Sequence, residues 1–417
     1  MVYEEKLLES LRQTVERILK IPYYQQKLKQ VGIRETGNIQ ALKDFQRIPL
    51  TSKEDLRENY PFGLFAEPME RIVRIHASSG TTGKPTVVGY TQKDIKLWAK
   101  IVANSLKRVG ITQSDVVQVA YGYGLFTGGM GLHYGCEELG ALVIPISGGN
   151  TSRQLMLMRD FGTTVLACTP SYALYLAESM EEAGIFRDEL KLRIGIFGAE
   201  PWTEGMREEI EARLGLRAYD IYGLSEIMGP GVAMECPEGR LHIDEHFYPE
   251  VLNESGLPVE EGQSGELVLT SLEKEAFPVL RYRTKDLTTI HYGRCSCGHE
   301  GWSMNRVSAR VDDMLIIRGV NIFPSQVEEA ILSVGGIEPH YLLVVERVGN
   351  LDQLEVWVEV NAQTFFDEVR QLEQLQQALQ KRIEEIAGIS VKVKLVEPKS
   401  IPRSEGKAKR VLDKRKM

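Results

Sequence analysis

The chain has 417 residues, of which 43% are hydrophobic and 26% charged, and this predicts a soluble protein of two or three domains. Its net charge of -8 implies no general affinity for nucleic acid, although a short basic tail runs from Lys407 to Lys414. Five scattered cysteines argue against a disulfide scaffold. No secretory signal and no apolar run long enough to span a membrane are recognised, so we expect a cytoplasmic protein.

Helices are expected first, because apolar residues such as Leu7, Leu11 and Ile18 recur at helical spacing within residues 1–60. The middle of the chain then alternates strand-like runs with amphipathic helices. The strand-like runs are DVVQVAYGYG, ALVIPI, TTVLACT and LRIGIFGAE. This alternation predicts a mostly parallel sheet covered by helices, and therefore an α/β fold.

The pattern of predicted helices and strands changes twice in the second half of the sequence. From about Ala233, short β runs such as GELVLTSL and DLTTIHYG predict a small β subdomain. After Asp312 come a strand (MLIIRG), a helix (PSQVEEAIL), two strands, a long helix and a last strand (VKVKLVE). That segment is an α+β unit large enough for its own core. We therefore expect two domains, residues 1–311 and residues 312–417.

A glycine-rich loop lies between the strand-like runs RIVRIHA and TVVGYT. Backbone N–H groups in such a turn can surround phosphate oxygens, hydroxyls add donors, and a lysine adds charge. A P-loop NTPase requires glycine at position 78 and a helix directly after the lysine, whereas this chain has Ser78 and Pro85. We therefore predict a strand–loop–strand phosphate clamp, formed by Ser78, Ser79, Gly80, Thr81, Thr82, Gly83 and Lys84.

Three further segments carry chemically suitable groups. In the stretch Tyr222–Glu226, a ring can stack on a base, a hydroxyl can bind phosphate and a carboxylate can hold Mg²⁺. Asp286 can accept both hydroxyls of a vicinal diol. The segment Gly198–Pro201 ends an apolar strand, where α/β folds usually place ligands. Taken alone, a strand-end turn or an exposed, salt-bridged aspartate explains these residues equally well.

Glycines are dense in the stretch Tyr123–Gly131, which follows a strand-like run. Glycines let a ligand approach the backbone, and aromatic rings can line a pocket. A structural strand-to-helix turn is the alternative. The residues expected to line a pocket are Tyr123, Phe126, Gly129 and Gly131.

Together these motifs resemble, in register over nearly the whole chain, the adenylate-forming enzymes, which include acyl-CoA synthetases, luciferases and peptide-synthetase adenylation domains. The resemblance implies that the glycine-rich loop holds the β- and γ-phosphates of ATP, that Glu226 binds Mg²⁺ and that Asp286 binds the ribose. It also implies nucleotide contacts from Ala199, Glu200, Pro201, Asp220, Tyr222, Gly223, Ser225 and Arg310.

The resemblance also implies a large adenylation domain followed by a small mobile C-terminal domain. Asp312 would be the hinge, and the Arg318–Gly319 loop would face the active site in the thioester-forming state. Lys407, in the last motif, would be the catalytic lysine, because a cation stabilises charge that develops when a carboxylate attacks a phosphate. Ala309 stands where the family usually has glycine, a small departure.

The stretch Tyr123–Gly131, with IIRGVNIFPSQVE and PRSEGKA, resembles the phenylacetate–CoA ligase branch. This implies that an aryl acid, above all phenylacetate, is adenylated with ATP and passed to coenzyme A. A ligase for another aryl acid, an adenylylating enzyme that does not use coenzyme A, and a regulatory protein with a degenerate site are the alternatives. The oligomeric state stays open, with a homodimer as one expectation.

Four residues bracket the expected β subdomain with metal-binding groups. Three thiolates and one imidazole can make a closed, tetrahedral Zn²⁺ site. The spacing is not that of a standard zinc finger, His299 competes with His242, and free cysteines are the alternative. We expect a structural zinc site formed by Cys236, His242, Cys295 and Cys297.

Overall fold

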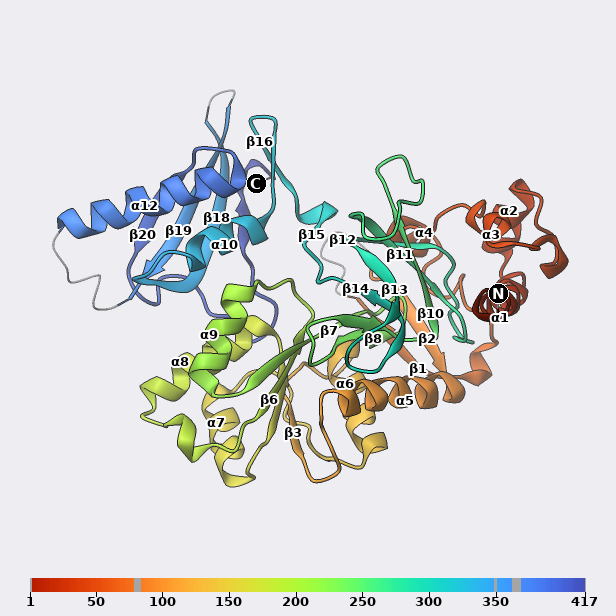
Figure 1. Ribbon diagram of the computed structural model, residues 1–417, viewed down its shortest axis with the longest axis horizontal. Helices are drawn as coiled ribbons and strands as arrows, with labels where there is room; N and C mark the ends of the chain where they lie inside the picture. Colours follow the sequence, from red (N-terminus) through yellow and green to blue (C-terminus); the bar gives the residue numbers. More distant parts are fainter. Residues whose placement is uncertain (1, 79–83, 349–350, 362–368, 417) are drawn as a thin grey trace. The chain divides into compact units, whose positions relative to one another are not determined.

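The computed structural model describes residues 2–78, 84–348, 351–361 and 369–416, and Figure 1 draws its helices and strands. The chain forms two compact units. Unit 1 comprises Met1–Gly148, Thr163–Ala167 and Tyr219–Arg306, and unit 2 comprises Gly149–Gly162, Cys168–Ala218 and Val307–Met417. The domain boundary between residues 311 and 312 stays a prediction, because unit 2 groups the C-terminal residues with two earlier segments. No helix in the described ranges is long and apolar enough to cross a membrane.

Unit 1 begins with the helices that the apolar spacing predicts. The first, α1 (Val2–Ile18), buries Leu11, Val15 and Ile18 completely along one face. After it come α2 (Pro22–Gln30), α3 (Leu42–Gln46) and α4 (Lys53–Glu58), with the short 3₁₀ helices η1 (Thr36–Asn38) and η2 (Met69–Arg71).

A hairpin and a parallel sheet follow in unit 1. Strands β1 (Ile72–Ala77) and β2 (Val87–Thr91) are antiparallel and flank the predicted phosphate loop. Strand β3 (Val116–Val119) is parallel to both β4 (Leu142–Ile144) and β5 (Val165–Cys168), which confirms the expected parallel sheet for these strands. Helices α5 (Gln92–Arg108) and α6 (Thr127–Leu139) pack side by side (Figure 1).

The strands from Gly229 onward in unit 1 pair antiparallel, but part of them belongs to the same nine-stranded sheet as β3, β4 and β5, so the small β subdomain predicted from about Ala233 is not a separate sheet there. They form two groups. The first runs in the order β13 (Ile290–Arg294), β14 (Glu300–Met304), β9 (Leu241–Ile243), β8 (Gly229–Glu235) and β7 (Arg217–Leu224). The second pairs β10 (Phe247–Leu252), β11 (Gly265–Ser271) and β12 (Tyr282–Thr288).

Unit 2 begins with helices and one buried strand. These are α7 (Thr151–Asp160), α8 (Pro170–Glu182), η3 (Arg187–Glu189), β6 (Ile194–Gly198) and α9 (Glu204–Leu214). All five residues of β6 are buried, which explains why its sequence is a continuous apolar run. The strand ends directly before the predicted Ala199–Pro201 motif.

The C-terminal part of unit 2 is the expected α+β unit. Its sheet runs β20 (Lys392–Val396), β19 (Leu351–Val360), β18 (Ile337–Val348) and β21 (Val411–Asp413). Helices α10 (Pro324–Leu332) and α12 (Val369–Ala387) pack against each other beside this sheet (Figure 1). Buried residues at a spacing of four, Leu379, Ile383 and Ala387, fix the face of α12 that meets the core. The remaining elements are β15 (Ala309–Arg310), η4 (Val311–Asp313), β16 (Leu315–Ile317), β17 (Val320–Ile322) and η5 (Lys414–Lys416).

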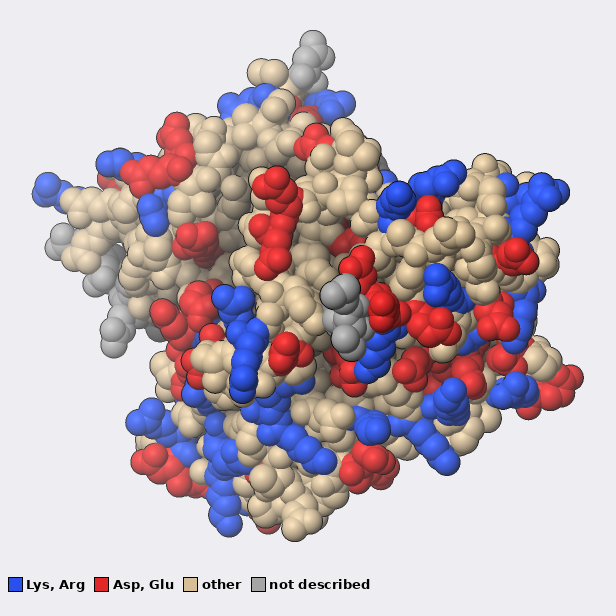
Figure 2. All heavy atoms as spheres, turned by 45° about the vertical axis from the view of Figure 1, so that its right-hand side comes forward, with Lys and Arg blue, Asp and Glu red and all other residues tan. Residues whose placement is uncertain are grey.

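Acidic and basic side chains are interspersed over the face of the molecule that Figure 2 draws. Such mixing agrees with a modest net charge of -8 over 417 residues.

Candidate active site

The strands on either side of the predicted phosphate loop, β1 and β2, pair antiparallel, so the strand–loop–strand setting is confirmed. The loop is closed at its base, where Ser78 N–H donates to the Thr86 carbonyl over 3.0 Å. Lys84 is exposed, with its Nζ 5.5 Å from the centre of the Tyr60 ring. The five predicted residues Ser79, Gly80, Thr81, Thr82 and Gly83 lie outside the described residues.

Two of the predicted nucleotide-binding residues of unit 1 meet directly. The Tyr222 hydroxyl, on β7, donates to Asp286 Oδ2, on β12, over 2.6 Å. Gly223 is required by packing, because a Cβ there would lie 1.8 Å from the carbonyl oxygen of Gly229. Because β7 and β8 approach closely at this glycine and pair up to Leu224 and Gly229, the chain must turn directly after Leu224. Asp220 lies earlier on β7, where its N–H donates to a carboxylate oxygen of Glu235 over 2.8 Å.

The turn after β7 holds the other two predicted groups, and both are buried. The hydroxyls of Ser225 and Thr127 are 2.9 Å apart, which ties the motif to the start of α6. Glu226 is only 5% exposed, and its Oε1 lies 3.6 Å from Lys53 Nζ. Thr127 and Lys53 were not predicted, because neither lies near the motif in the sequence.

A buried lysine beneath this turn was also missed. Lys274 is fully buried, donates from Nζ to the Ile227 carbonyl over 2.9 Å, and lies 4.5 Å from the centre of the Tyr90 ring. Burial lowers the pKa of Lys274 to about 8, against the attraction of the Asp94 and Glu226 carboxylates. The flanking glutamates, Glu273 and Glu275, make the sequence look like an exposed charged turn, so no local signal marks this residue.

Replacing Lys274 with methionine is expected to remove a rise in stability between about pH 8 and pH 10.5. The folded-state pKa lies below that of the unfolded chain, so the unfolded chain binds more protons in this window and stability rises with pH. Urea midpoints measured at several pH values across the window test this. The exposed Lys93→Met variant is the control and should retain the rise. An unchanged rise in Lys274→Met would contradict the assignment.

The residues of the predicted acid pocket run from the segment after β3 into the first turns of α6. The Tyr123 hydroxyl is 3.3 Å from His133 Nδ1, and Phe126 directly precedes the first residue of α6. The two glycines serve close packing: a Cβ on Gly129 would lie 2.8 Å from the Gly122 carbonyl oxygen, and one on Gly131 would lie 2.4 Å from the Trp98 ring. Their neighbours are therefore protein atoms, and their part in binding an acid stays a prediction.

In unit 2, the predicted Ala199–Pro201 motif is tied to the loop that carries Lys407. Ala199 has a φ of 72°, an uncommon conformation for alanine that turns the chain at the end of β6. Glu200 accepts from two N–H groups: Ser171 donates to Oε1 and Ala408 donates to Oε2, each over 2.8 Å.

The other side of this loop is held as well, because Thr169 Oγ1 donates to the Gly406 carbonyl over 2.9 Å. Lys407 is therefore anchored by backbone contacts on both of its neighbours, while its own side chain is exposed. The Ser404 hydroxyl donates to the Lys407 carbonyl over 2.9 Å.

A cavity of about 390 Å³ in unit 2 brings several predicted residues together. Its walls include Glu200, Pro201, Arg310 and Asp312. Arg310 Nε lies 3.3 Å from Asp312 Oδ1, so the expected nucleotide contact and the expected hinge form an ion pair. The residues directly after Lys407, namely Ala408, Lys409 and Arg410, also line the cavity.

The predicted coenzyme A-facing loop joins β16 to β17 at a tight turn. Both of its residues have positive φ, 51° at Arg318 and 80° at Gly319, as such a turn requires. Arg318 donates from Nη2 to the Ser390 carbonyl over 2.6 Å. Neither residue is part of the cavity lining, and their role stays a prediction.

The expected zinc ligands of unit 1 lie together. The ligand atoms of Cys236, His242, Cys295 and Cys297 are all within 4.8 Å of one another. Cys297 Sγ is 3.3 Å from His242 Nε2, and the His299 ring packs against that of His242 with 4.4 Å between ring centres. All five cysteines are free thiols.

Comparison with known proteins identifies the family of this chain. The sequence pattern of the AMP-binding enzymes matches residues 17–272, and that of the AMP-binding enzyme C-terminal domain matches residues 319–415. The chain belongs to the AMP-binding enzyme family. The resemblance noted in the motifs is thereby confirmed at the level of the family.

Several relatives of this AMP-binding enzyme share about half of its residues. A phenylacetate-coenzyme A ligase of Escherichia coli strain K12 is 53% identical, over 95% of this chain and 91% of the relative. Others are the phenylacetate-coenzyme A ligases of Thermus thermophilus, 48% identical over 99% of this chain and 96% of the relative, and of Pseudomonas putida, 50% identical over 99% and 93%. The predicted resemblance to this branch is confirmed.

Solved structures support the fold of this AMP-binding enzyme. A 2-hydroxyisobutyryl-CoA ligase in the postadenylation state, in complex with R3-HIB-AMP, has a TM-score of 0.92 at 28% identity, covering 99% of this chain and 90% of that one. The same ligase in the thioesterification state, in complex with 2-HIB-AMP and CoA, has a TM-score of 0.71 at 29% identity, covering 99% and 89%. The α/β fold with a large AMP-binding part and a smaller C-terminal part is confirmed.

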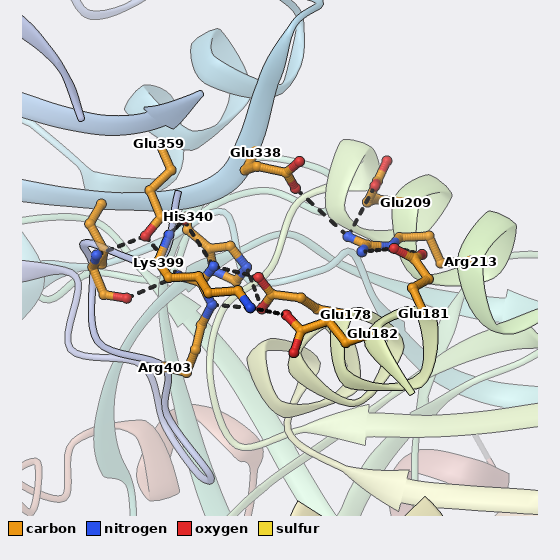
Figure 3. A network of polar contacts seen from close by, with 11 residues as sticks. Glu178, Glu181, Glu182, Glu209, Arg213, Glu338, His340, Glu359, Lys399 and Arg403 are labelled. Carbon is orange, nitrogen blue, oxygen red and sulfur yellow. Dashed lines mark hydrogen bonds and ion pairs between the residues drawn. The ribbon is translucent and has the colours of Figure 1, made fainter. Parts of the chain in front are cut away.

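Unit 2 of this AMP-binding enzyme also contains a network of charged side chains that the sequence motifs did not predict (Figure 3). Arg403 lies between Glu178 of α8 and Glu359 of β19, while Lys399 and Arg213 pair with further carboxylates. The guanidinium nitrogens of Arg213 lie within 4.0 Å of carboxylate oxygens of three residues, Glu181, Glu209 and Glu338. Arg403 belongs to the motif PRSEGKA that carries Lys407, whereas the carboxylates around it lie in segments that no motif marked.

Proposed function

We propose that this chain is an ATP-dependent, AMP-forming ligase that joins phenylacetate to coenzyme A, giving phenylacetyl-CoA, AMP and pyrophosphate. The observation that carries the proposal is the 48–53% identity to phenylacetate-coenzyme A ligases over almost the full length of both chains. The contacts between Tyr222 and Asp286, and between Glu200 and the Lys407 loop, support it independently. A regulatory protein with a degenerate site is disfavoured, because every chemically required residue type is present.

In the first half-reaction, a carboxylate oxygen of the acid attacks the α-phosphorus of ATP. The new bond is the carboxyl–phosphate bond of a mixed anhydride, and the bond to pyrophosphate breaks. Lys407 is proposed to lie beside the reacting oxygens and to stabilise their negative charge. Asp286, fixed by the Tyr222 hydroxyl, is proposed to accept the ribose hydroxyls.

The proposed magnesium ligand fits the ion. Mg²⁺ prefers carboxylate oxygens and binds proteins through one or two of them together with substrate phosphates. Glu226 offers such a carboxylate, which the turn after β7 holds in a buried position. When bound there, Mg²⁺ would neutralise charge on the ATP phosphates. The side chain of Lys53, 3.6 Å from Glu226, balances part of the carboxylate charge.

In the second half-reaction, the coenzyme A thiolate attacks the acyl carbon. A carbon–sulfur bond forms, the carbon–oxygen bond to phosphate breaks, and AMP leaves. No side-chain nucleophile is needed in either half. We propose that Asp312 is the hinge between the two half-reactions and that the Arg318–Gly319 turn faces the acyl group in the second, as staged assembly of a site requires.

One assay separates this proposal from its rivals. AMP release is measured with phenylacetate, benzoate, 4-hydroxyphenylacetate and 2-hydroxyisobutyrate, each with and without coenzyme A. We expect the greatest release with phenylacetate and coenzyme A together, with the thioester identified by mass spectrometry. Pyrophosphate release without AMP release, whether or not coenzyme A is present, would favour an adenylylating enzyme, and a preference for another acid would reassign the substrate.

The cofactors of this reaction are ATP, Mg²⁺ and coenzyme A. Zinc takes no part in it, since the two half-reactions require no second metal. The homodimer and the cytoplasmic location stay predictions.

A further inference from the structure

Two hairpin loops in unit 1 have the same backbone pattern. In Cys236–Arg240, the N–H of the first residue donates to the carbonyl of the fifth over 2.8 Å, and Gly239 N–H donates back to Cys236 over 2.9 Å. In Cys295–His299 the corresponding bonds are 2.8 Å and 2.9 Å, the second donated by Gly298. Both glycines have positive φ, 79° and 90°. Each loop therefore begins with a cysteine held in the same local geometry.

These loops bring sulfur and nitrogen atoms to distances that suit a metal ion better than a disulfide. Cys236 Sγ and Cys295 Sγ are 4.0 Å apart, whereas a disulfide needs about 2.05 Å. Zinc–sulfur bonds of about 2.3 Å in a tetrahedron place ligand atoms about 3.8 Å apart. The separations of 4.0 Å between these sulfurs and 3.3 Å between Cys297 Sγ and His242 Nε2 lie on both sides of that value.

The structure also distinguishes the two candidate histidines. His242 is 2% exposed and its Nε2 is the atom that faces the cysteines. Its Nδ1 is buried without a hydrogen-bond partner among the described residues. His299 is absent from the set of converging ligand atoms and instead packs its ring against His242.

We propose that Cys236, His242, Cys295 and Cys297 bind one Zn²⁺ ion in a closed structural site that clamps the β13–β14 hairpin to the β8–β9 hairpin. Thiolates and imidazole together select zinc among the common divalent ions, and four protein ligands leave no open position for substrate. Strand pairing between these hairpins is short, with two registered pairs between β14 and β9. The metal would supply the cross-link that so short a ladder lacks.

The clamp supports the nucleotide motif through one strand. Cys236 directly follows β8, and the other end of β8 pairs with β7 at Gly223 and Leu224. Loss of the metal is therefore expected to loosen the support of the Tyr222–Glu226 turn, although no ligand takes part in the chemistry.

Elemental analysis of the purified wild-type protein, grown with added zinc, tests the site. We expect about one zinc ion per chain, released when a mercurial reagent titrates the thiols and followed with a metallochromic dye. His242→Ala and Cys297→Ser are expected to lose most of the zinc and to melt at a lower temperature. His299→Ala and Cys136→Ser, which leave the four ligands in place, are expected to retain it.

Wild-type protein without zinc, or with iron in its place, would overturn the proposal. So would retention of zinc in His242→Ala together with its loss in His299→Ala, which would move the ligand to the other histidine. The wild-type measurement stands even where a ligand variant does not fold. Its outcome is also independent of the substrate assay, because metal content is measured without turnover.

Discussion

Replacing Lys407 with alanine is expected to lower the rate of adenylate formation by about 100- to 1000-fold, while thioester formation from supplied phenylacetyl-adenylate continues. The first half-reaction brings two anions together, and a cation is needed where their charge concentrates. The second half-reaction expels AMP from a mixed anhydride that is already activated. The two rates should therefore separate in this variant.

The structure makes Lys407 a suitable residue for this test. Its backbone is held on both sides, by Thr169 at the Gly406 carbonyl and by Glu200 at the Ala408 N–H. Removing an exposed side chain leaves these contacts in place, so the loop should keep its path. A loss of activity would then report on the charge and not on a collapsed loop.

Pyrophosphate release measures the first half-reaction, and coenzyme A-dependent consumption of synthetic phenylacetyl-adenylate measures the second. Lys414→Ala, in the same basic tail but paired with Glu346, is the matched control and should retain both. Lys409→Ala tests the neighbouring lysine. Equal loss of both half-reactions in Lys407→Ala, or selective loss of the first in Lys409→Ala, would reject the role given to Lys407.

The sequence predicts a functional feature best where short stretches of the chain contain the residues that form it. The strand–loop–strand setting of the phosphate loop follows from a local pattern and is confirmed. The predicted grouping of Cys236 with Cys295 and Cys297 joins two short motifs that lie far apart in the sequence, and their ligand atoms do lie together. The meeting of Tyr222 with Asp286 agrees with their shared assignment to the nucleotide, although the resemblance and not the spacing suggested it.

The features that were missed depend on contacts between distant segments. Lys274 lies in a charged turn that looks exposed, and only the fold buries it against Tyr90. A Cβ on Gly131 would lie 2.4 Å from the Trp98 ring, a packing constraint that the sequence does not display, while the part of Gly131 in binding an acid stays a prediction. Strand β21 lies in a basic tail that looks solvated, and its pairing with β18 has no local signal. Tertiary packing decides each of these cases, and a single sequence does not display it.

The two carboxylates that hold Arg403 belong to different parts of unit 2 (Figure 3). Arg403 donates to Glu178 over 2.7 Å and 2.6 Å, and to Glu359 over 2.8 Å and 2.9 Å. Glu359 is fully buried and also accepts from the N–H groups of Lys399 and Ile401. If residues after Asp312 turn as one body, Glu359 moves with Arg403 whereas Glu178 on α8 does not. The two hydrogen bonds to Glu359 then stabilise the fold of the C-terminal residues, whereas the two hydrogen bonds to Glu178 must break between the half-reactions.

Arg403→Ala is accordingly expected to destabilise the protein by about 3–5 kcal/mol, because it leaves the buried Glu359 without its guanidinium partner. Glu178→Gln is expected to change stability little and to slow adenylate formation by about tenfold, since it weakens only the contact to α8. Urea unfolding and the two half-reaction assays measure these effects. Arg382→Ala, which removes an exposed pair with Glu385, is the control and should cost less than about 1 kcal/mol. Equal destabilisation by Arg403→Ala and Arg382→Ala, or equal slowing of both half-reactions by Glu178→Gln, would show that the two carboxylates do not divide these roles.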